Sequence, residues 1–353
     1  MFAEKTVFVV GAGASVEAGL PTGEGLIPKI TDYLGVLHGE AGEHIRYAPM
    51  MPESKDDRRY NKTMMEAAAK RITKGLHSSF SIDNFIDQNK GDQFIEAVGK
   101  LAIAKTILAE ESGSKMMVQN DNIYNEPVLA KLRGTWYAKL SSLIFEGCTK
   151  DGLAERLGRI TFIIFNYDRC VEHYLFWAIR LTYGLTQLDA AGLMKNLTIH
   201  HPYGSVGLLP WQDDQAPVYF GNPPNGEVSP WIAAGRIKTF TEGVGSNEHT
   251  AIQQSVLDAN MVIFLGFGFH HLNMSLLTSG ESPPPLFTTG SKRYFGTVVG
   301  RSKSDQEIIT SKIDLLCRGS SGQPRIDLAA VKCAPFFDEF YSTFAAERYV
   351  SPS

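Results

Sequence analysis

The sequence has few cysteines, no excess of basic residues and no long hydrophobic run. The four cysteines stand at scattered positions, 148, 170, 317 and 333, so their pattern predicts neither a zinc site nor a disulfide framework. The net charge of −4 gives no basic footprint for direct binding of nucleic acid. No apolar run approaches the roughly 20 residues that cross a bilayer, and the N-terminus does not resemble a signal peptide. We therefore expect a cytoplasmic protein with reduced thiols, no membrane contact and no bound metal.

The composition of the chain is that of a globular protein with alternating strands and helices. Hydrophobic residues make up 43% and charged residues 20% of the 353 residues, which is enough for one large or two ordinary domains. Short apolar runs at 6–10, 159–165, 197–200, 261–265 and 292–299 alternate with helical patterns. This alternation predicts an α/β fold, a Rossmann-like doubly wound parallel sheet. We expect residues 1–39 and 158–353 to form the core, and residues 40–157 to form a helical insertion between its first two strands.

Several local expectations go with this outline. Residues 15–38 are expected to form one helix, and Ser81 is expected to cap a helix at 81–87. Residues 40–61 and 208–245 are rich in turn-forming or charged residues, so we expect long loops there, with a short strand near 218–220. The remaining expected segments are helices at 62–74, 93–110, 126–145, 170–181, 248–260 and 304–316, and a short strand with a closing helix within 329–348.

The first predicted strand runs directly into a glycine-rich turn, Gly11-Ala-Gly-Ala-Ser15. A buried strand that ends in such a turn and then enters a helix is typical of phosphate binding in nucleotide-binding folds. Gly11 allows a tight turn, Gly13 allows close approach to a pyrophosphate, and Ser15 with the N–H groups of the first helical turn can bind phosphate oxygens. The full G-x-G-x-x-G fingerprint is not met because residue 16 is Val, so a tight turn without a ligand remains an alternative.

Polar or glycine motifs follow four of the predicted strands. Because ligands bind at the carboxyl ends of strands in an open parallel sheet, we expect these motifs to form one site. Asn166 and Asp168 are alternatively caps of the next helix, and His200 and His201 are alternatively surface loop residues. The motifs are Gly11-Ala-Gly-Ala-Ser15, Asn166-Tyr-Asp168, His201-Pro-Tyr-Gly204 and Gly266-Phe-Gly268.

Taken together, these motifs resemble those of the sirtuin-like proteins. The resemblance is closer to the bacterial anti-phage defence branch, which hydrolyses NAD, than to the deacetylases. Gly11-Ala-Gly-Ala-Ser15 with Gly19-Leu-Pro21 is similar to the sirtuin phosphate loop, and Asn166-Tyr-Asp168 is similar to the Q-N-x-D element. Tyr203-Gly-Ser205 with its preceding histidines resembles the H-G element, Gly266 resembles a glycine that faces the cofactor ribose, and Ser81–Ile86 resembles an element common in the defence branch.

Two departures from the deacetylase pattern count against protein deacylation. The four-cysteine zinc module is absent, and Pro21 is followed by Thr22-Gly-Glu24 instead of an aromatic–Arg pair. The H-G dipeptide is also interrupted, because Tyr203 precedes Gly204.

The resemblance implies that NAD is the substrate, that the bond between nicotinamide and ribose is cleaved, and that no metal is needed. It implies that Asn166 positions a ribose hydroxyl or water, and that Asp168 favours positive charge and the nicotinamide amide. His201, with His200 as second choice, would act as the base. The residues implied to bind the dinucleotide are Gly11, Ala12, Gly13, Ser15, Gly19, Pro21, Gly204 and Gly266.

An NAD hydrolase inside a cell needs restraint, so we expect regulation by assembly. The resemblance suggests a homo-oligomer, or a partner such as a hexameric DNA-translocating ATPase or an Argonaute-like protein. Two other functions stay open: ADP-ribosyl transfer or deacylation with an acceptor other than water, and a non-catalytic nucleotide-binding sensor. A nicotinamide dehydrogenase is opposed by the incomplete glycine fingerprint and by the lack of a clear ribose-binding acid.

Overall fold

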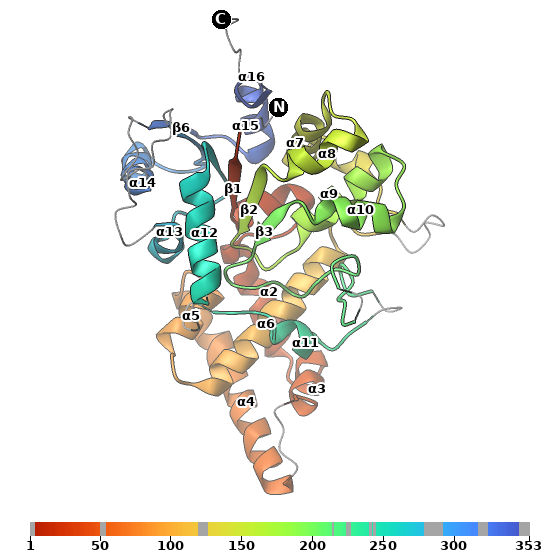
Figure 1. Cartoon of the computed structure of the whole chain (residues 1–353). Coiled ribbons are helices and arrows are strands. Elements are labelled where there is room, and N and C mark those ends of the chain that lie inside the picture. Colours follow the sequence, from red (N-terminus) through yellow and green to blue (C-terminus); the bar gives the residue numbers. More distant parts are fainter. Residues whose placement is uncertain are drawn as a thin grey trace, which may run out of the picture.

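The computed structural model describes residues 4–49, 54–118, 126–213, 215–223, 227–239, 242, 245–278, 292–316 and 324–345. Six parallel strands in these residues form one sheet with the order β3-β2-β1-β4-β5-β6 (Figure 1). This is the strand order of the doubly wound Rossmann fold, so the predicted fold class is confirmed. The strands are β1 (Thr6–Val10), β2 (Ile160–Ile164), β3 (Thr198–His200), β4 (Met261–Leu265), β5 (Arg293–Thr297) and β6 (Arg325–Ala329).

Helices cover both faces of the sheet, which explains why the central strands are continuously apolar. Successive residues of a strand point to opposite faces, so Val7 and Val9 join one core whereas Phe8 and Val10 join the other. The first core contains residues of α2 (Gly23–Gly35), α3 (Glu40–Arg46), α4 (Lys55–Gly75), α5 (Ile82–Gln88), α6 (Gln93–Ser112), α11 (Pro230–Ala234), α12 (Ser246–Asp258), α13 (His271–Leu277) and α14 (Lys303–Leu315). The second contains residues of α7 (Trp136–Phe145), α8 (Lys150–Leu157), α9 (Cys170–Thr182), α10 (Gln187–Met194), α15 (Cys333–Glu339) and α16 (Tyr341–Ala345).

The chain between β1 and β2 is mostly helical, although these two strands are neighbours in the sheet. Its helices are divided between the two cores, since α2 to α6 pack on one side and α7 and α8 on the other. That residues 40–157 form a unit of their own therefore stays a prediction. Within the described ranges, no helix has the length and apolar character needed to cross a membrane.

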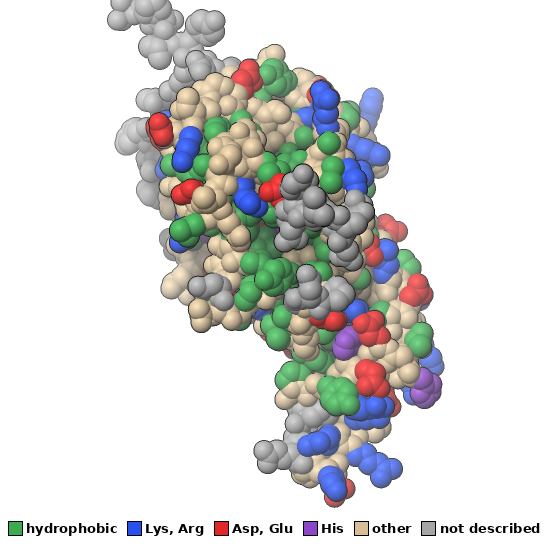
Figure 2. Space-filling model, turned by 90° about the vertical axis from the view of Figure 1, so that its right-hand side faces the viewer, with side chains coloured by type: hydrophobic (Ala, Val, Ile, Leu, Met, Phe, Trp, Pro, Cys, Tyr) green, Lys and Arg blue, Asp and Glu red, His purple; other side chains and the backbone are tan. Residues whose placement is uncertain are grey.

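The helix α4 extends away from the sheet at one end of the molecule (Figure 1). Figure 2 shows positive and negative side chains interspersed over this narrow end. A cavity of about 440 Å³ lies between α2, α3 and α4, and none of its lining residues belongs to the predicted site.

Two predictions in the first part of the chain are wrong. The predicted loop at 40–61 contains α3 and the start of α4. The first turns of α4 are exposed and too polar to show a hydrophobic period. Asp56 and Asp57 favour the start of α4 through the helix dipole. The predicted helix at 15–38 is interrupted at Gly19, which has a φ of 104°. A new helix begins after Thr22, whose Oγ1 accepts the Gly25 N–H at 3.2 Å.

Other boundaries also differ from the prediction. Only Trp136–Phe145 of the predicted helix at 126–145 is α-helical, because a short 3₁₀ turn and Gly134 precede it. No strand forms at 218–220, α11 lies where loops were expected, and the closing helix is divided at Phe340. The helices α8, α10 and α13 were not predicted, and residues 346–348 lie outside the described residues. The Ser81 cap is confirmed, since its Oγ accepts the Asn84 N–H at 3.2 Å.

Candidate functional site

Ser15 is a shared partner of Asn166 and Asp168. Its Oγ donates to Asp168 Oδ2 at 2.8 Å and accepts from Asn166 Nδ2 at 3.0 Å. Ser15 ends the single helical turn α1 (Ala12–Ser15) after β1, and the other two residues follow the adjacent strand β2. All three residues are buried, with exposed fractions of 1%, 6% and 5%. The structure therefore brings three of the predicted site residues into one buried cluster at the carboxyl ends of β1 and β2.

Asp168 also binds the start of the helix that follows it. Its Oδ1 accepts the backbone N–H of Cys170, the first residue of α9, at 3.1 Å. This contact agrees with the alternative in which Asp168 supports the next helix. Both of these donors, the Ser15 hydroxyl and the Cys170 amide, are neutral.

His201 connects the turn after β2 to α9 through both of its ring nitrogens. Nδ1 lies 3.3 Å from the backbone oxygen of Asn166, and Nε2 lies 2.5 Å from Oε1 of the buried Glu172. Both partners are acceptors, an arrangement that favours a ring with a proton on each nitrogen. Burial lowers the pKa of His201, but the Glu172 carboxylate and the Asn166 carbonyl outweigh this and raise the pKa above its usual value. The base role that the sequence suggested for His201 would require one of these two bonds to break.

The pKa of His200 is shifted in the opposite direction. Its Nε2 is buried and has no hydrogen-bond partner in the described part of the chain. Burial lowers the pKa of His200; Glu248 partly offsets this effect, and the neighbouring His201 adds to it. Because Ile199 packs against the second core, the alternation of the strand directs His200 to the first. The lowered pKa of His200 favours the neutral imidazole, and its Nε2 is left without a partner among the described residues.

Tyr167 links the same turn to the helical region between β1 and β2. Its ring lies in the first core, and its Oη donates to Oδ1 of Asp83 in α5. Burial raises the pKa of Asp83, and the hydrogen bond from Tyr167 acts against that shift. Asp83 belongs to the stretch Ser81–Ile86, but its contact with the turn after β2 was not predicted.

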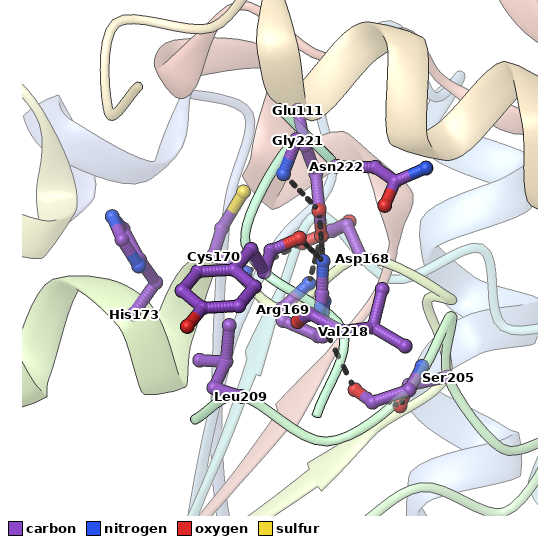
Figure 3. Close-up of polar contacts among 12 residues, drawn as sticks. Glu111, Asp168, Arg169, Cys170, His173, Ser205, Leu209, Val218, Gly221 and Asn222 are labelled. Atoms are coloured by element: carbon purple, nitrogen blue, oxygen red, sulfur yellow. Dashed lines mark hydrogen bonds and ion pairs between the residues drawn. The ribbon is translucent and has the colours of Figure 1, made fainter. Parts of the chain in front are cut away.

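Arg169, the last residue of this turn, forms a buried ion pair that the sequence analysis missed (Figure 3). The side chains of Arg169 and Glu111 are 1% and 0% exposed. Glu111 lies at the end of α6, 58 positions away, and no spacing or motif connects the two residues. Glu111 is one of five charged residues in α6, so its charge alone identifies neither the residue nor its partner.

The glycine loop after β1 packs tightly against the loop after β4. The N–H of Gly13 donates to the oxygen of Gly266 at 3.0 Å, and that of Gly11 donates to the oxygen of Leu265 at 2.9 Å. A Cβ on Gly11 would lie 2.5 Å from the oxygen of Gly266, and one on Gly266 would lie 2.1 Å from the nitrogen of Ala14. Close backbone packing therefore explains these glycines. In this structure the N–H groups of Gly11 and Gly13 are bonded within the protein and do not point to a phosphate.

The remaining predicted residues lie in turns. Gly19 caps a 3₁₀ turn, Pro21 precedes the α2 cap, and neither hydrogen-bonds to Asn166, Asp168 or His201 in the described structure. The N–H of Gly204 donates to the oxygen of His201 at 2.8 Å, and a Cβ there would lie 2.0 Å from the oxygen of Arg236.

The described residues hold no group of three or more His, Cys, Asp or Glu side chains placed to bind a metal ion. Cys148, Cys170 and Cys333 are free thiols, and Cys317 lies outside the described residues.

The fold and the cluster define a Rossmann-like α/β protein with buried polar groups at the carboxyl ends of its strands. No protein-family model matches the chain, and no curated protein matches it either. The chemistry of the cluster is therefore the basis on which a function can be inferred.

Proposed function

We propose that this chain is a sirtuin-like NAD hydrolase that cleaves the bond between nicotinamide and ribose. The observation that supports this most directly is the cluster of Ser15, Asn166 and Asp168, which two loops form at the carboxyl ends of adjacent strands. Dinucleotides bind at this end of the sheet in doubly wound folds. The resemblance of the motifs supports NAD as the substrate.

The charge of the cluster suits the proposed reaction. Loss of neutral nicotinamide leaves a ribose with oxocarbenium character, and a fixed negative charge beside it lowers the barrier. Glu111 is paired with Arg169 and Glu172 with His201, whereas the donors to Asp168 are neutral. Asp168 therefore carries the excess negative charge, and we assign it the stabilisation of the cation.

The two histidines receive different roles. His201 bonds to the backbone oxygen of Asn166 and to Glu172, so it holds the Asn166 turn against α9. His200 stays the second choice for the base: its pKa is lowered and its buried Nε2 has no partner among the described residues, while no hydrogen bond there joins it to Asn166 or Asp168. Asn166 would position that water or a ribose hydroxyl, and the glycine loop with Gly204 and Gly266 would line the dinucleotide.

The resemblance alone supports a biological setting. We propose that the reaction depletes NAD during anti-phage defence, within a homo-oligomer or with a partner such as a hexameric DNA-translocating ATPase or an Argonaute-like protein.

The test is the rate of nicotinamide release from NAD by the purified protein and by Asn166→Ala. We expect a loss of about 100-fold or more, because a preorganised polar group is removed. Asn196→Ala is the control: the Asn196 amide, at the surface, donates to the oxygen of Leu193 at 3.0 Å, and the variant should keep the wild-type rate. Equal rates for Asn166→Ala and wild type would contradict the assignment. ADP-ribose on protein would indicate transfer, and NAD binding without turnover would favour a sensor.

A further inference from the structure

We infer, on the basis of the proposed function, that Glu111 and Arg169 are positioning residues for the site. They hold the turn Asn166–Asp168 and a segment here named the strap, residues 205–213 and 215–221. They would act on turnover through this placement, beyond any contribution to folding.

The guanidinium of Arg169 uses all three of its nitrogens in directional bonds (Figure 3). Nε and Nη2 donate to Glu111, at 3.1 Å and 2.5 Å. Nη1 donates to the backbone oxygen of Val218, and Nη2 also donates to that of Tyr219 at 3.1 Å. A weaker contact of 3.5 Å joins Nη1 to the oxygen of Gly207. One planar side chain therefore binds three carbonyl oxygens at two places of the strap, Gly207 and Val218–Tyr219.

Glu111 completes the arrangement from the other side. Its Oε1 accepts the backbone N–H of Arg169 at 3.1 Å, and its Oε2 accepts the N–H of Gly221 at 3.0 Å. The first bond fixes the peptide unit between Asp168 and Arg169, so it bears on the direction of the Asp168 carboxylate. The second fixes the end of the strap.

The start of the strap is fixed by the same turn. The N–H of Val206 donates to the oxygen of Tyr167 at 3.0 Å, two residues after Gly204. Two ring stacks also hold the strap, since Phe220 lies on His173 with centroids 4.0 Å apart and Trp211 lies on Phe176 at 5.3 Å. Both ends of the strap are therefore tied to the turn or to Glu111.

The pair of Glu111 and Arg169 can be replaced so that its positioning of the strap is lost while the stability of the fold is kept. A buried ion pair loses much of its attraction to desolvation, so an apolar pair of similar volume often gives equal stability. An apolar pair cannot donate to the carbonyl groups of the strap or accept from the N–H groups of Arg169 and Gly221. A lysine keeps the charge but lacks the planar fork. Positioning can therefore be removed while the fold is retained.

The test compares Arg169→Lys, the double variant Glu111→Leu with Arg169→Met, and the control Lys292→Met. Lys292 is also a buried cation, and its Nζ donates to the backbone oxygens of Val256 at 2.9 Å and Leu257 at 2.6 Å. It precedes β5, at the opposite end of the sheet. For each protein we would measure the thermal midpoint, kcat and KM for nicotinamide release, and amide exchange in the strap.

We expect both Arg169 variants to lower kcat by up to about 100-fold, because misplacement of catalytic groups by about 1 Å has this effect. KM should change less, and exchange at the Val206 and Val218 amides should become faster. Lys292→Met should lower the thermal midpoint without changing kcat or strap exchange.

If both Arg169 variants keep the wild-type kcat and strap exchange, and differ only in thermal midpoint as the control does, the positioning role is refuted. If the wild-type protein releases no nicotinamide, with or without DNA and the candidate ATPase partner, the proposed function fails instead. In that case amide exchange in the strap alone tests whether Glu111 and Arg169 position the strap. Exchange that is unchanged in the variants would refute this positioning role. If one variant does not fold, the other carries the test.

Discussion

The two ends of the sheet differ in how they hold polar side chains. At the carboxyl ends, Ser15, Asn166 and Asp168 are buried and bond to one another. At the amino ends, the ion pair between Lys5 and Asp258 lies at the surface, and the exposed fractions of the two side chains are 64% and 39%. Water solvates such a surface pair, so breaking it costs little, whereas a buried polar group that loses its partner is costly. Of these two sets of contacts, the one that is costlier to break lies at the end where doubly wound folds bind ligands.

Lys292 is a buried cation at the amino end of the sheet, and its contacts are simpler than those of Arg169 at the carboxyl end. Lys292 donates to carbonyl oxygens in the last turn of α12, where a positive charge is favoured by the helix dipole. Both of these bonds go to backbone atoms at one helix end. The pair of Glu111 and Arg169, by contrast, joins α6, the turn after β2 and the strap.

The largest effect on stability is expected for Glu111→Ala. This change leaves the Arg169 cation buried without its carboxylate, so the free energy of unfolding should fall by about 3–5 kcal/mol. Asp258→Ala at the amino end frees Lys5 to water and should cost about 1 kcal/mol or less. Urea denaturation of the variants measures both values.

Glu110→Ala is the control on the same helix. Glu110 neighbours Glu111 but pairs with the half-exposed Lys29 at 2.7 Å, so its loss should also cost about 1 kcal/mol or less. Equal losses for Glu110→Ala and Glu111→Ala would mean that burial does not raise the cost of breaking the pair of Glu111 and Arg169.

A smaller effect is expected where the glycine loop meets the loop after β4. Gly266→Ala places a Cβ 2.1 Å from the nitrogen of Ala14 at a φ of 53°, so the backbone must shift and stability should fall by about 2 kcal/mol or more. Gly268→Ala is the matched control, since its Cβ would meet nothing within 4 Å. Thermal unfolding that shows the same midpoint for both variants would contradict the tight loop contact.

The smallest effect is a pH dependence that comes from His201. Its pKa is raised in the folded state, so the folded protein binds this proton more tightly than the unfolded chain. The contribution is fully present below the unfolded pKa of about 6.5 and is lost as the pH rises through the folded pKa. The thermal midpoint should therefore fall over this range, and the fall should be smaller in Glu172→Gln. A midpoint with the same pH dependence in both proteins would argue against a protonated His201.

The sequence allowed prediction of the features that depend on neighbouring residues. The strands β1, β2, β4 and β5 are short apolar runs buried on both faces, and Ser81 is a local cap. The positions of Asn166 and Asp168 followed from the rule that parallel strands end at one edge of the sheet. The exposed start of α4 was missed because a fully polar helix carries no periodic signal.

Other features depend on tertiary contacts and leave no trace in a single sequence. Glu111 and Arg169 become partners only when α6 packs beside the turn after β2. The opposite pKa shifts of His200 and His201 depend on Glu172 and on burial, and two adjacent histidines look alike in a sequence. The presence of glycine at positions 11 and 13, which suggested a phosphate site, is also explained by the close approach of the Gly266 backbone.

The most direct measurement is the initial rate of nicotinamide release from NAD by the wild-type protein and by Asp168→Asn. It should be made with and without DNA and the candidate ATPase partner. The substitution removes the excess negative charge but keeps an acceptor for the Cys170 amide. We predict equal amounts of nicotinamide and free ADP-ribose from the wild type, and a rate lower by about 100-fold or more in the variant at a similar thermal midpoint. Equal rates in the two proteins, or no release by the wild type under any of these conditions, would contradict the account.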